Sequence, residues 1–368
     1  MSRRIGKPKR VYLDLTHVGR HVTGIERIAI ELFEKVEFQD ADIVPVRSKN
    51  LISLIFKQQV LFPLLALLQP HAKFVFPGFP PSPLMQLFRD RVVLYVHDLF
   101  LVTRRHDLSL KAKLYMAWPF QRAVTHLRHF LVNSEKTRAE LEPFVAPDAS
   151  IRLYRPPVRN VFSLSPGTRG QRDSESAALR LVAVGTVEPR KNFSYAAQIR
   201  DAHAGQNRGA VTLDIIGRAG WGGVAEHLAE REGINLRGYL SLADAGAVIE
   251  NADIYLCTSH DEGLGLPLLE VQYAGLTVVA PDQPVFREVL RESAIYIPPG
   301  DAEAAARVIR SALSQPGWRQ KSVKAAQFNL ERWNSAAFSD ATRARAMFSE
   351  LSDAPPATRP ERIRVKST

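Results

Sequence analysis

The sequence predicts an α/β protein made of two doubly wound domains, each with a parallel sheet. Short apolar runs alternate with longer helical patterns along most of the 368 residues, and this alternation is typical of βαβ units with helices on both faces of a sheet. The chain also exceeds the length at which one hydrophobic core keeps growing, so two domains are expected. A polar segment rich in Gly, Ser and Arg, at residues 163–178, separates the two sets of strands and is predicted to be a linker.

The strands are predicted from short apolar runs rich in Val, Ile, Leu and Phe. They are residues 11–15, 43–46, 73–76, 92–96 and 130–132 in the first part, and residues 179–184, 211–216, 254–257, 277–280 and 294–297 in the second. We therefore expect a first domain at residues 1–162 and a second at 179–352, whose last helix is free to pack back on the first. Residues 353–368 lack periodicity and are predicted to be disordered. Because open parallel sheets bind ligands outside the carboxyl ends of their strands, a ligand-binding cleft between the domains is expected.

The composition is that of an ordinary globular protein, with 45% apolar residues. The single cysteine, Cys257, excludes an intramolecular disulfide and fits a reducing compartment, and no Cys/His cluster suggests a structural zinc site. Residues 1–10 are basic but lack the apolar core of a signal peptide. The expected location is the cytoplasm.

The positive charge is concentrated in the first part of the chain. Residues 1–160 contain 25 Lys and Arg and 14 Asp and Glu, whereas residues 161–368 contain 24 of each kind. A basic first domain suits an anionic membrane surface or a pyrophosphate-linked acceptor, and charge scattered only for solubility is the alternative. No basic run is interleaved with aromatic residues, so nucleic acid is not an expected partner.

The apolar segment at residues 51–68 is interrupted by Lys57, by Gln58 and Gln59, and by Pro63. It falls short of the roughly 20 apolar residues that span a bilayer. Two interpretations stay open: the segment lies on a membrane as an amphipathic element, or it packs beneath the first domain, which the pattern favours.

A glycine-punctuated turn between two glutamates is the main functional signal. It reads Glu262-Gly263-Leu264-Gly265-Leu266-Pro267-Leu268-Leu269-Glu270. The glycines allow the backbone to approach a ligand, Pro267 suits the first position of a helix, and free amides at a helix start suit a phosphate or a sugar oxygen. Carboxylates only accept hydrogen bonds, so a flanking pair fits a polyol such as a ribose or a hexose. Taken alone, the turn is equally well explained as a loop-to-helix junction.

A second signal follows the predicted strand at residues 179–184. The sequence continues as Gly185-Thr186-Val187-Glu188-Pro189-Arg190-Lys191-Asn192 and then enters a helical pattern. Cations normally avoid the positive end of a helix dipole, so Arg190 and Lys191 at a helix start suggest that an anion such as diphosphate compensates them. A solvated pair of side chains is the alternative.

Together these segments resemble the retaining nucleotide-sugar glycosyltransferases of family 4, which are group 1 glycosyl transferases with the GT-B fold. The resemblance extends from about Leu179 to Leu313 and adds Gly217, Tyr239 and the segment 274–280 to the two motifs. It is looser in the first domain. The segments there that match are Thr23-Gly24-Ile25, Val96-His97-Asp98 and Asn133-Ser134-Glu135.

The resemblance implies a fold of two Rossmann-like doubly wound domains facing across a cleft, and it implies roles for individual residues. Glu262, Lys191, Arg190 and His97 would be catalytic, with the cations on the departing diphosphate and His97 and Glu262 on the transferred sugar. Glu270 would hold the ribose hydroxyls, and backbone amides of the glycine turn would assist the cations at the departing diphosphate. The remaining donor-binding residues would be Gly263, Leu264, Gly265, Gly185, Gly217, Tyr239 and Gly24.

The resemblance also implies that no metal or other cofactor is required, because fixed cations stabilise the leaving group. Asp40-Ala41-Asp42 matches the Asp-x-Asp motif by which the other main glycosyltransferase fold holds a metal. The motif comes before its strand, whereas a metal site of this kind is expected after one. It is therefore predicted to be a solvated turn.

The function expected from this resemblance is hexose transfer from a nucleotide sugar to a saccharide or lipid-linked saccharide acceptor in surface polysaccharide synthesis. The start at Thr23 and the turn at Glu188 to Asn192 resemble mannosyltransferases that use GDP-mannose. The alternatives are a sugar-nucleotide epimerase of the same fold and a non-catalytic protein that binds nucleotide sugars or polyanions.

Overall fold

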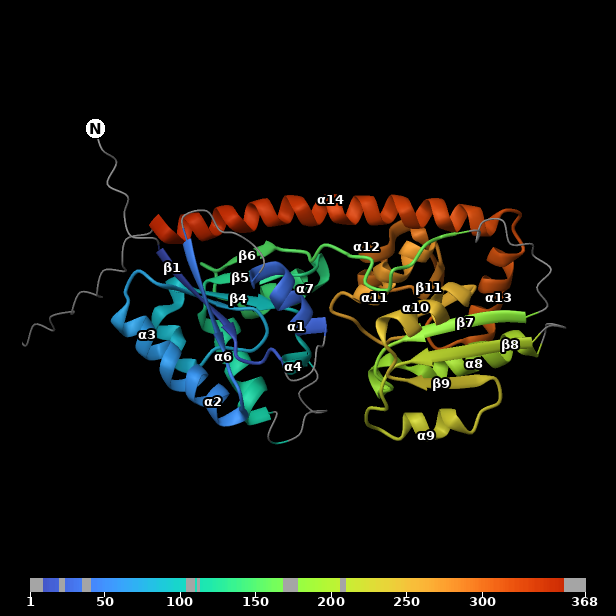
Figure 1. Ribbon diagram of the computed structural model, residues 1–368, viewed down its shortest axis with the longest axis horizontal. Coiled ribbons are helices and arrows are strands. Elements are labelled where there is room, and N and C mark those ends of the chain that lie inside the picture. The colour runs from blue at the N-terminus through green and yellow to red at the C-terminus, as the bar shows by residue number, and fades with distance from the viewer. Residues whose placement is uncertain are drawn as a thin grey trace, which may run out of the picture. The chain divides into compact units, whose positions relative to one another are not determined.

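The computed structural model divides the chain into two compact units (Figure 1). Unit 1 comprises Met1–Pro156 and Ser339–Thr368, and unit 2 comprises Pro157–Phe338. The structure describes residues 9–19, 24–34, 41–103, 110, 113–167, 178–205 and 210–353. Most of the polar segment at 163–178 and the tail after residue 353 therefore lie outside the described residues.

Unit 1 is built on a parallel sheet of six strands in the order β2-β1-β3-β4-β5-β6. The strands are β1 Lys9–Leu15, β2 Ala41–Arg47, β3 Lys73–Phe76, β4 Val92–Val96, β5 His129–Val132 and β6 Ser150–Leu153. The five strands predicted for this part of the chain are all present. The short edge strand β6 was missed because none of its residues is fully buried and its sequence lacks a continuous apolar run.

The helices of unit 1 cover this sheet (Figure 1). They are α1 Gly24–Ala29, η1 Ile30–Glu34, α2 Leu51–Phe56, η2 Lys57–Leu61, α3 Phe62–Leu68, η3 Pro83–Arg91, α4 Phe100–Thr103, η5 Lys113–Ala117, α6 Trp118–His126, α7 Glu135–Leu141 and η6 Glu142–Phe144. The core between sheet and helices contains fully buried aromatic rings, including Phe62, Phe74 and Phe76.

Unit 2 contains a second parallel sheet of six strands in the order β12-β11-β10-β7-β8-β9. The strands are β7 Ala178–Val184, β8 Ala210–Ile216, β9 Ile234–Gly238, β10 Ile254–Leu256, β11 Thr277–Pro281 and β12 Ala294–Ile297. All five predicted strands are present. The edge strand β9 was missed because only its first residue is buried.

The helices of unit 2 pack on both faces of its sheet, and two separate apolar clusters form the cores on those faces. These helices are η8 Pro189–Lys191, α8 Phe193–Ala204, α9 Val224–Ala229, α10 Leu242–Asn251, α11 Leu266–Glu270, η9 Val271–Ala274, α12 Pro284–Leu290, η10 Arg291–Ser293 and α13 Ala302–Leu313. The doubly wound α/β class predicted from the sequence is confirmed for both units.

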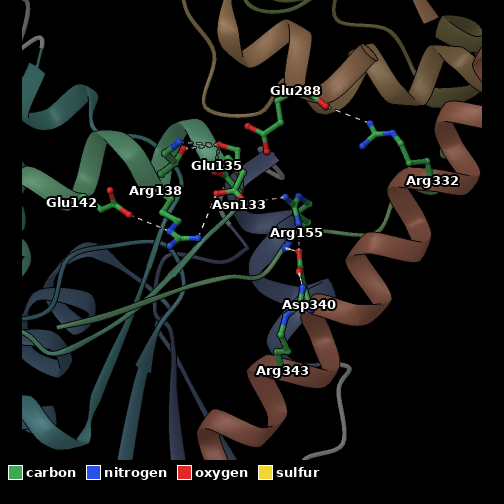
Figure 2. A network of polar contacts seen from close by, with 11 residues as sticks. Asn133, Glu135, Arg138, Glu142, Arg155, Glu288, Arg332, Asp340 and Arg343 are labelled. Atoms are coloured by element: carbon green, nitrogen blue, oxygen red, sulfur yellow. Dashed lines mark hydrogen bonds and ion pairs between the residues drawn. The ribbon is translucent and has the colours of Figure 1, made fainter. Parts of the chain in front are cut away.

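The last helix, α14 Trp318–Asp353, contributes to both units, because the division falls at Ser339 within it. Inside unit 1, the guanidinium of Arg155 lies 2.7 Å from the fully buried carboxylate of Asp340 (Figure 2). Inside unit 2, the backbone N–H of Val158 donates to the side-chain oxygen of Asn334 at 2.8 Å. Each unit therefore holds its own part of the helix by polar contacts.

Two sequence expectations in unit 1 need correction. The segment Leu51–Leu68 forms a helix of which only 17% is buried, so it does not pack beneath the domain except along one narrow face. Asp42 lies inside β2 and not in a turn, because the strand begins at Ala41. Asp40 lies outside the described residues.

Candidate functional site

The strand order of unit 2 creates a topological switch point between β7 and β10. The chain passes from β7 to β8 and β9 on one side, whereas β10, β11 and β12 extend on the other side. Ligands of doubly wound sheets bind at such a point, outside the carboxyl ends of the strands. The segments that follow β7 and β10 are residues 185–192 and 257–265, which contain the two motifs singled out in the sequence.

Arg190 and Lys191 lie in the 3₁₀ turn η8, directly before helix α8. Asn192 joins the turn to the helix in the left-handed conformation, with φ of 50°, which asparagine tolerates better than most residues. The two loops are held together by their backbones, because the N–H of His260 donates to the carbonyl of Arg190 at 2.9 Å. The hydroxyl of Thr258 donates to the carbonyl of Lys191 at 3.1 Å.

Glu262 binds both cations. Its Oε1 accepts a hydrogen bond from Lys191 Nζ at 2.5 Å, and its Oε2 accepts one from Arg190 Nη1 at 3.1 Å. The Ser259 hydroxyl also donates to Oε1, at 2.7 Å. The Glu262 side chain is buried, whereas those of Arg190 and Lys191 are 24% and 14% exposed. The carboxylate is therefore surrounded by donors, while the cations keep a path to solvent.

The electrostatics of this cluster favour the charged forms of Glu262 and Arg190. Burial opposes ionisation of Glu262, but the charges of Lys191 and Arg190, with hydrogen bonds from Lys191 and Ser259, outweigh it and hold its pKa below the ordinary value. Burial likewise opposes the charge of Arg190, and the carboxylates of Glu262 and Glu188 reverse this and raise its pKa. The site is a pre-formed ionic cluster at the switch point.

Two members of this cluster received no role in the sequence analysis. Glu188 is buried and lies 2.9 Å from the Arg190 guanidinium, so it fixes the side chain that Glu262 also binds. Ser259 orients the Glu262 carboxylate. The sequence places Glu188 two residues before Arg190. It does not show which charged side chains form pairs, because the pairs depend on how the two loops contact each other.

The glycine turn after β10 leads into helix α11, which begins at Leu266 with Gly265 as its N-cap. Gly265 has φ of 76°, a conformation that favours glycine. Pro267 is thus the second and not the first helical residue. Leu264 has its side chain in the core, so only its backbone is available to a ligand. Glu270 is buried at the end of α11, beyond the first turn.

Gly185 and Gly217 bring two loops into direct contact. A Cβ added to Gly217 would lie 1.9 Å from the Gly185 carbonyl oxygen, and its φ of 158° is unfavourable for other residues. Gly185 in turn lies against the Lys191 side chain, because a Cβ added to Gly185 would lie 3.0 Å from Lys191 Cε. Tyr239, by contrast, is 73% exposed and its ring is covered by the guanidinium of Arg218. The structure thus brings Gly185, Gly217, Lys191 and Glu262 together and leaves Tyr239 at the surface.

In unit 1, His97 follows β4 and is fixed by its neighbours. Its Nε2 lies 2.7 Å from the carbonyl oxygen of Pro77, and its own carbonyl accepts from the Asn133 side chain at 2.8 Å. Burial lowers the pKa of His97 to about 4, so the imidazole is neutral at pH 7. Since the Pro77 carbonyl can only accept, the neutral ring carries its proton on Nε2 and leaves Nδ1 as an acceptor.

His17 is a candidate that the sequence analysis missed. It follows β1, and strand order places β1 beside β3 at the switch point of unit 1. A Cβ added to Gly78, after β3, would lie 2.3 Å from His17 Nε2. The His17 side chain is buried, yet among the described residues neither of its ring nitrogens has a hydrogen-bond partner. Such a group is rare in native structures unless a ligand or water satisfies it.

Gly24, the remaining predicted site residue, begins α1 and has nothing within 4 Å of an added Cβ. Thr23, which precedes it, lies outside the described residues. Within the described part of the chain, no group of three or more His, Cys, Asp and Glu side chains could hold a metal ion.

Residues 169–328 match the family model described as glycosyl transferases group 1. This region, which makes up most of unit 2, resembles the group 1 glycosyl transferases. The ionic cluster of the glycosyltransferase, with Lys191, Arg190 and Glu262, lies inside the matched region. The resemblance stated from the sequence motifs is thereby confirmed.

Two curated relatives are mannosyltransferases. The glycosyltransferase is 24% identical to O-antigen chain mannosyltransferase B of Escherichia coli over 351 residues, which cover 83% of this chain and 89% of that protein. It is 31% identical to the phosphatidyl-myo-inositol mannosyltransferase of Mycobacterium leprae over 159 residues, or 40% of each chain.

Solved structures show the same fold. Anabaena HepE, crystallised with UDP and glucose, matches with a TM-score of 0.66 and 12% identity, over 93% of this chain and all of that one. WaaG, a glycosyltransferase involved in lipopolysaccharide biosynthesis, matches with a TM-score of 0.62 and 15% identity, over 92% and 99% of the two chains. The glycosyltransferase therefore has the GT-B fold.

Proposed function

We propose that this glycosyltransferase is a retaining hexosyltransferase that moves mannose from GDP-mannose to a saccharide or lipid-linked saccharide acceptor in surface polysaccharide synthesis. The observation that carries the proposal is the ionic cluster of Lys191, Arg190 and Glu262 at the switch point of unit 2. The names of the curated relatives support mannose as the sugar. HepE, which was crystallised with UDP and glucose, supports a nucleotide-sugar donor in general.

The proposed role of the cations is to stabilise the diphosphate as it leaves. Negative charge develops on the diphosphate while the glycosidic bond breaks, so cations that are already oriented act most strongly in the transition state. Glu262 holds Lys191 and Arg190 in place before the donor arrives. The acceptor hydroxyl then attacks the anomeric carbon from the face that the diphosphate leaves, which retains the configuration without a covalent glycosyl-enzyme.

The remaining donor contacts are also part of the proposal. Glu270 binds the ribose hydroxyls, and the amides of residues 263–265 assist the diphosphate. In unit 1, we assign His97 and His17 to sugar hydroxyls, because Nδ1 of His97 can accept from a hydroxyl and the neutral imidazole of His17 can both donate and accept. The two unpaired nitrogens of His17 support this assignment.

We further propose that the enzyme needs no divalent metal, since Lys191 and Arg190 supply the positive charge at the leaving group. Its acceptor is expected at the cytoplasmic face of a membrane, where the enzyme works as a peripheral protein. The basic first part of the chain, with 25 Lys and Arg and 14 Asp and Glu in residues 1–160, supports attraction to anionic lipids.

The test is to incubate the purified full chain with membrane extract and a panel of labelled nucleotide sugars, with and without EDTA. We expect GDP-mannose to be consumed, label to appear in a lipid fraction, and EDTA to leave the rate unchanged. NMR of the product should show the anomeric configuration of the donor.

Three other results would contradict parts of this proposal. Conversion of the donor sugar without any acceptor would identify an epimerase. Tight donor binding with no turnover of any sugar would identify a binding protein. Loss of activity in EDTA that Mg²⁺ or Mn²⁺ restores would replace the cation mechanism with a metal-assisted one.

A further inference from the structure

The helix formed by α2, η2 and α3, residues Leu51–Leu68, is firmly attached to unit 1 along one narrow face. Phe62 and Ala66 are buried in the core. Nearer to the N-terminal end of the helix, the Gln58 amide donates to the Asp14 carboxylate at 2.9 Å and to the Thr16 hydroxyl at 3.1 Å. We call this element the flank helix. It lies along the side of unit 1 (Figure 1).

Both ends of the flank helix are capped. Asn50 accepts a hydrogen bond from the Ser53 N–H at 2.8 Å, as an N-cap residue does. At the other end, the Arg91 guanidinium donates to the carbonyls of Ala66 at 2.7 Å and Gln69 at 2.9 Å. These bonds satisfy backbone groups that a helix end leaves open. The element is thus a stable part of the folded unit.

The outward face of the flank helix is apolar, which is the reverse of an ordinary surface helix. Ile52 is 80% exposed, and the residues that follow it on the same face at intervals of four are exposed as well. The exposed apolar residues of the helix are Leu51, Ile52, Ile55, Phe56, Val60, Leu64, Leu67 and Leu68. A contiguous apolar surface of this kind marks a site of interaction.

Neighbouring elements also expose apolar side chains. The turn η3 contacts both α3 and α6. It exposes Leu84 and Leu87, and Trp118 at the start of α6 is 48% exposed. Tryptophan is enriched at the boundary between lipid headgroups and acyl chains.

The stretch of sequence that contains the flank helix carries charge of one sign. Residues 43–89 contain five Lys and Arg and no Asp or Glu. Of these cations, Lys49 is exposed just before the helix and Lys57 lies within it. An apolar face in a segment whose charged side chains are all cations complements an anionic bilayer, which offers acyl chains beneath negatively charged headgroups.

The same contacts argue against a transmembrane helix. Contrary to the expectation from the sequence, the 18 residues of this helix, with a mean hydropathy of 1.9, are by length and composition alone enough for a membrane span. However, a helix that crossed the bilayer would have to break the Gln58 bonds to Asp14 and Thr16 and remove Phe62 from the core. While unit 1 stays folded, only the exposed face of the flank helix can contact a membrane.

We propose that the flank helix lies in the headgroup region of an anionic bilayer and docks unit 1 on the membrane. This inference gives a structural basis for the peripheral location in the proposed function. It rests on the proposed function only in the choice of membrane. Because Thr16 accepts from Gln58 and precedes His17, the docking element is bonded to the loop that carries the proposed sugar-binding histidine.

The test is sedimentation of the full-length protein with vesicles of phosphatidylglycerol and phosphatidylethanolamine, compared with vesicles of phosphatidylcholine alone. We expect binding to the anionic vesicles and much weaker binding to the neutral ones. The triple variant Ile52→Ser, Phe56→Ser, Leu67→Ser should bind about tenfold more weakly or worse. The matched control is Phe328→Ser, which removes a ring more exposed than that of Phe56 from α14 within unit 2 and should bind as the wild type does.

The substituted side chains are exposed, so the variants should fold, and thermal unfolding checks this. The single variant Ile52→Ser, at the most exposed position, should show part of the loss. Unchanged vesicle binding of the triple variant would overturn the proposal, as would equal binding to neutral vesicles. A wild-type dimer that the triple substitution converts to a monomer, without vesicle binding, would identify a second copy as the occupant. The vesicle assay contains no sugar donor, so its failure and a failure of the transferase assay can be told apart.

Discussion

Lys191 Nζ lies 2.5 Å from Glu262 Oε1, and the two residues come from loops that follow different strands of unit 2. The pair connects the loop after β7 to the loop after β10, across the switch point of the sheet. Sequence motifs that were assigned separately, one to diphosphate and one to sugar, therefore form a single ionic cluster. The consequence is that a change in either motif alters the other.

We predict that Glu262→Gln destabilises the protein at neutral pH and that the deficit shrinks in acid. The substitution leaves Lys191 and Arg190 without their carboxylate, which we expect to cost about 2 to 3 kcal/mol, less than a fully buried pair because the cations are partly exposed. The folded pKa of Glu262 lies below its ordinary value of 4.5. Its contribution to stability is therefore complete above about pH 4.5 and is lost as the pH falls through the folded pKa. Thermal unfolding of both proteins across pH measures this, and a constant difference at all pH values would contradict it.

The buried histidines predict a separate pH dependence. Burial lowers the pKa values of His17 and His97 from 6.5 to about 4. The unfolded chain takes up protons below 6.5 that the folded chain does not, so stability is complete above pH 6.5 and falls toward pH 4, by up to about 3 kcal/mol for each residue. His17→Gln should make the fall of the melting temperature across this range less steep, because His97, His129 and His203, whose pKa values are also about 4, still contribute. His227→Gln, an exposed position on α9, should not, and an equally steep profile in His17→Gln would contradict the assignment.

The contact between Gly217 and Gly185 predicts a stability effect without any charge. Gly217→Ala places a Cβ 1.9 Å from a backbone oxygen at a φ of 158°, so the loops must separate. We expect a loss of about 3 kcal/mol and reduced transfer activity. Gly205→Ala is the control, since its Cβ would meet only the Asp201 oxygen, at 3.5 Å. Equal melting temperatures for the two variants would contradict the predicted clash.

Much of the fold was predictable because buried parallel strands appear as short apolar runs. Ten of the twelve strands in the described residues were found in this way. The two missed strands, β6 and β9, lie at sheet edges, where partial exposure replaces the apolar run with polar residues. The order of the strands was not predictable, because the pairing of β7 with β10 depends on contacts between residues far apart in the chain.

The candidate site was predictable as far as its motifs. The glycines, Arg190, Lys191 and Glu262 were identified by residue type and spacing, but the ion pairs among them follow from strand order. His17 was missed because a histidine after a strand has no distinctive pattern, and its significance lies in unpaired nitrogens and in the closeness of Gly78. The flank helix was misjudged because composition does not indicate which side of an apolar helix is covered.

The most direct test of the central claim is the transfer rate of Lys191→Ala with labelled GDP-mannose and membrane extract. Removing one pre-oriented cation from the leaving group should lower the rate about a hundredfold or more. Lys321→Ala, an exposed position on α14, should retain the wild-type rate, and thermal unfolding should show that both variants are folded. A Lys191→Ala enzyme that is folded and transfers sugar at the wild-type rate would contradict the assignment of this cluster to the departing diphosphate.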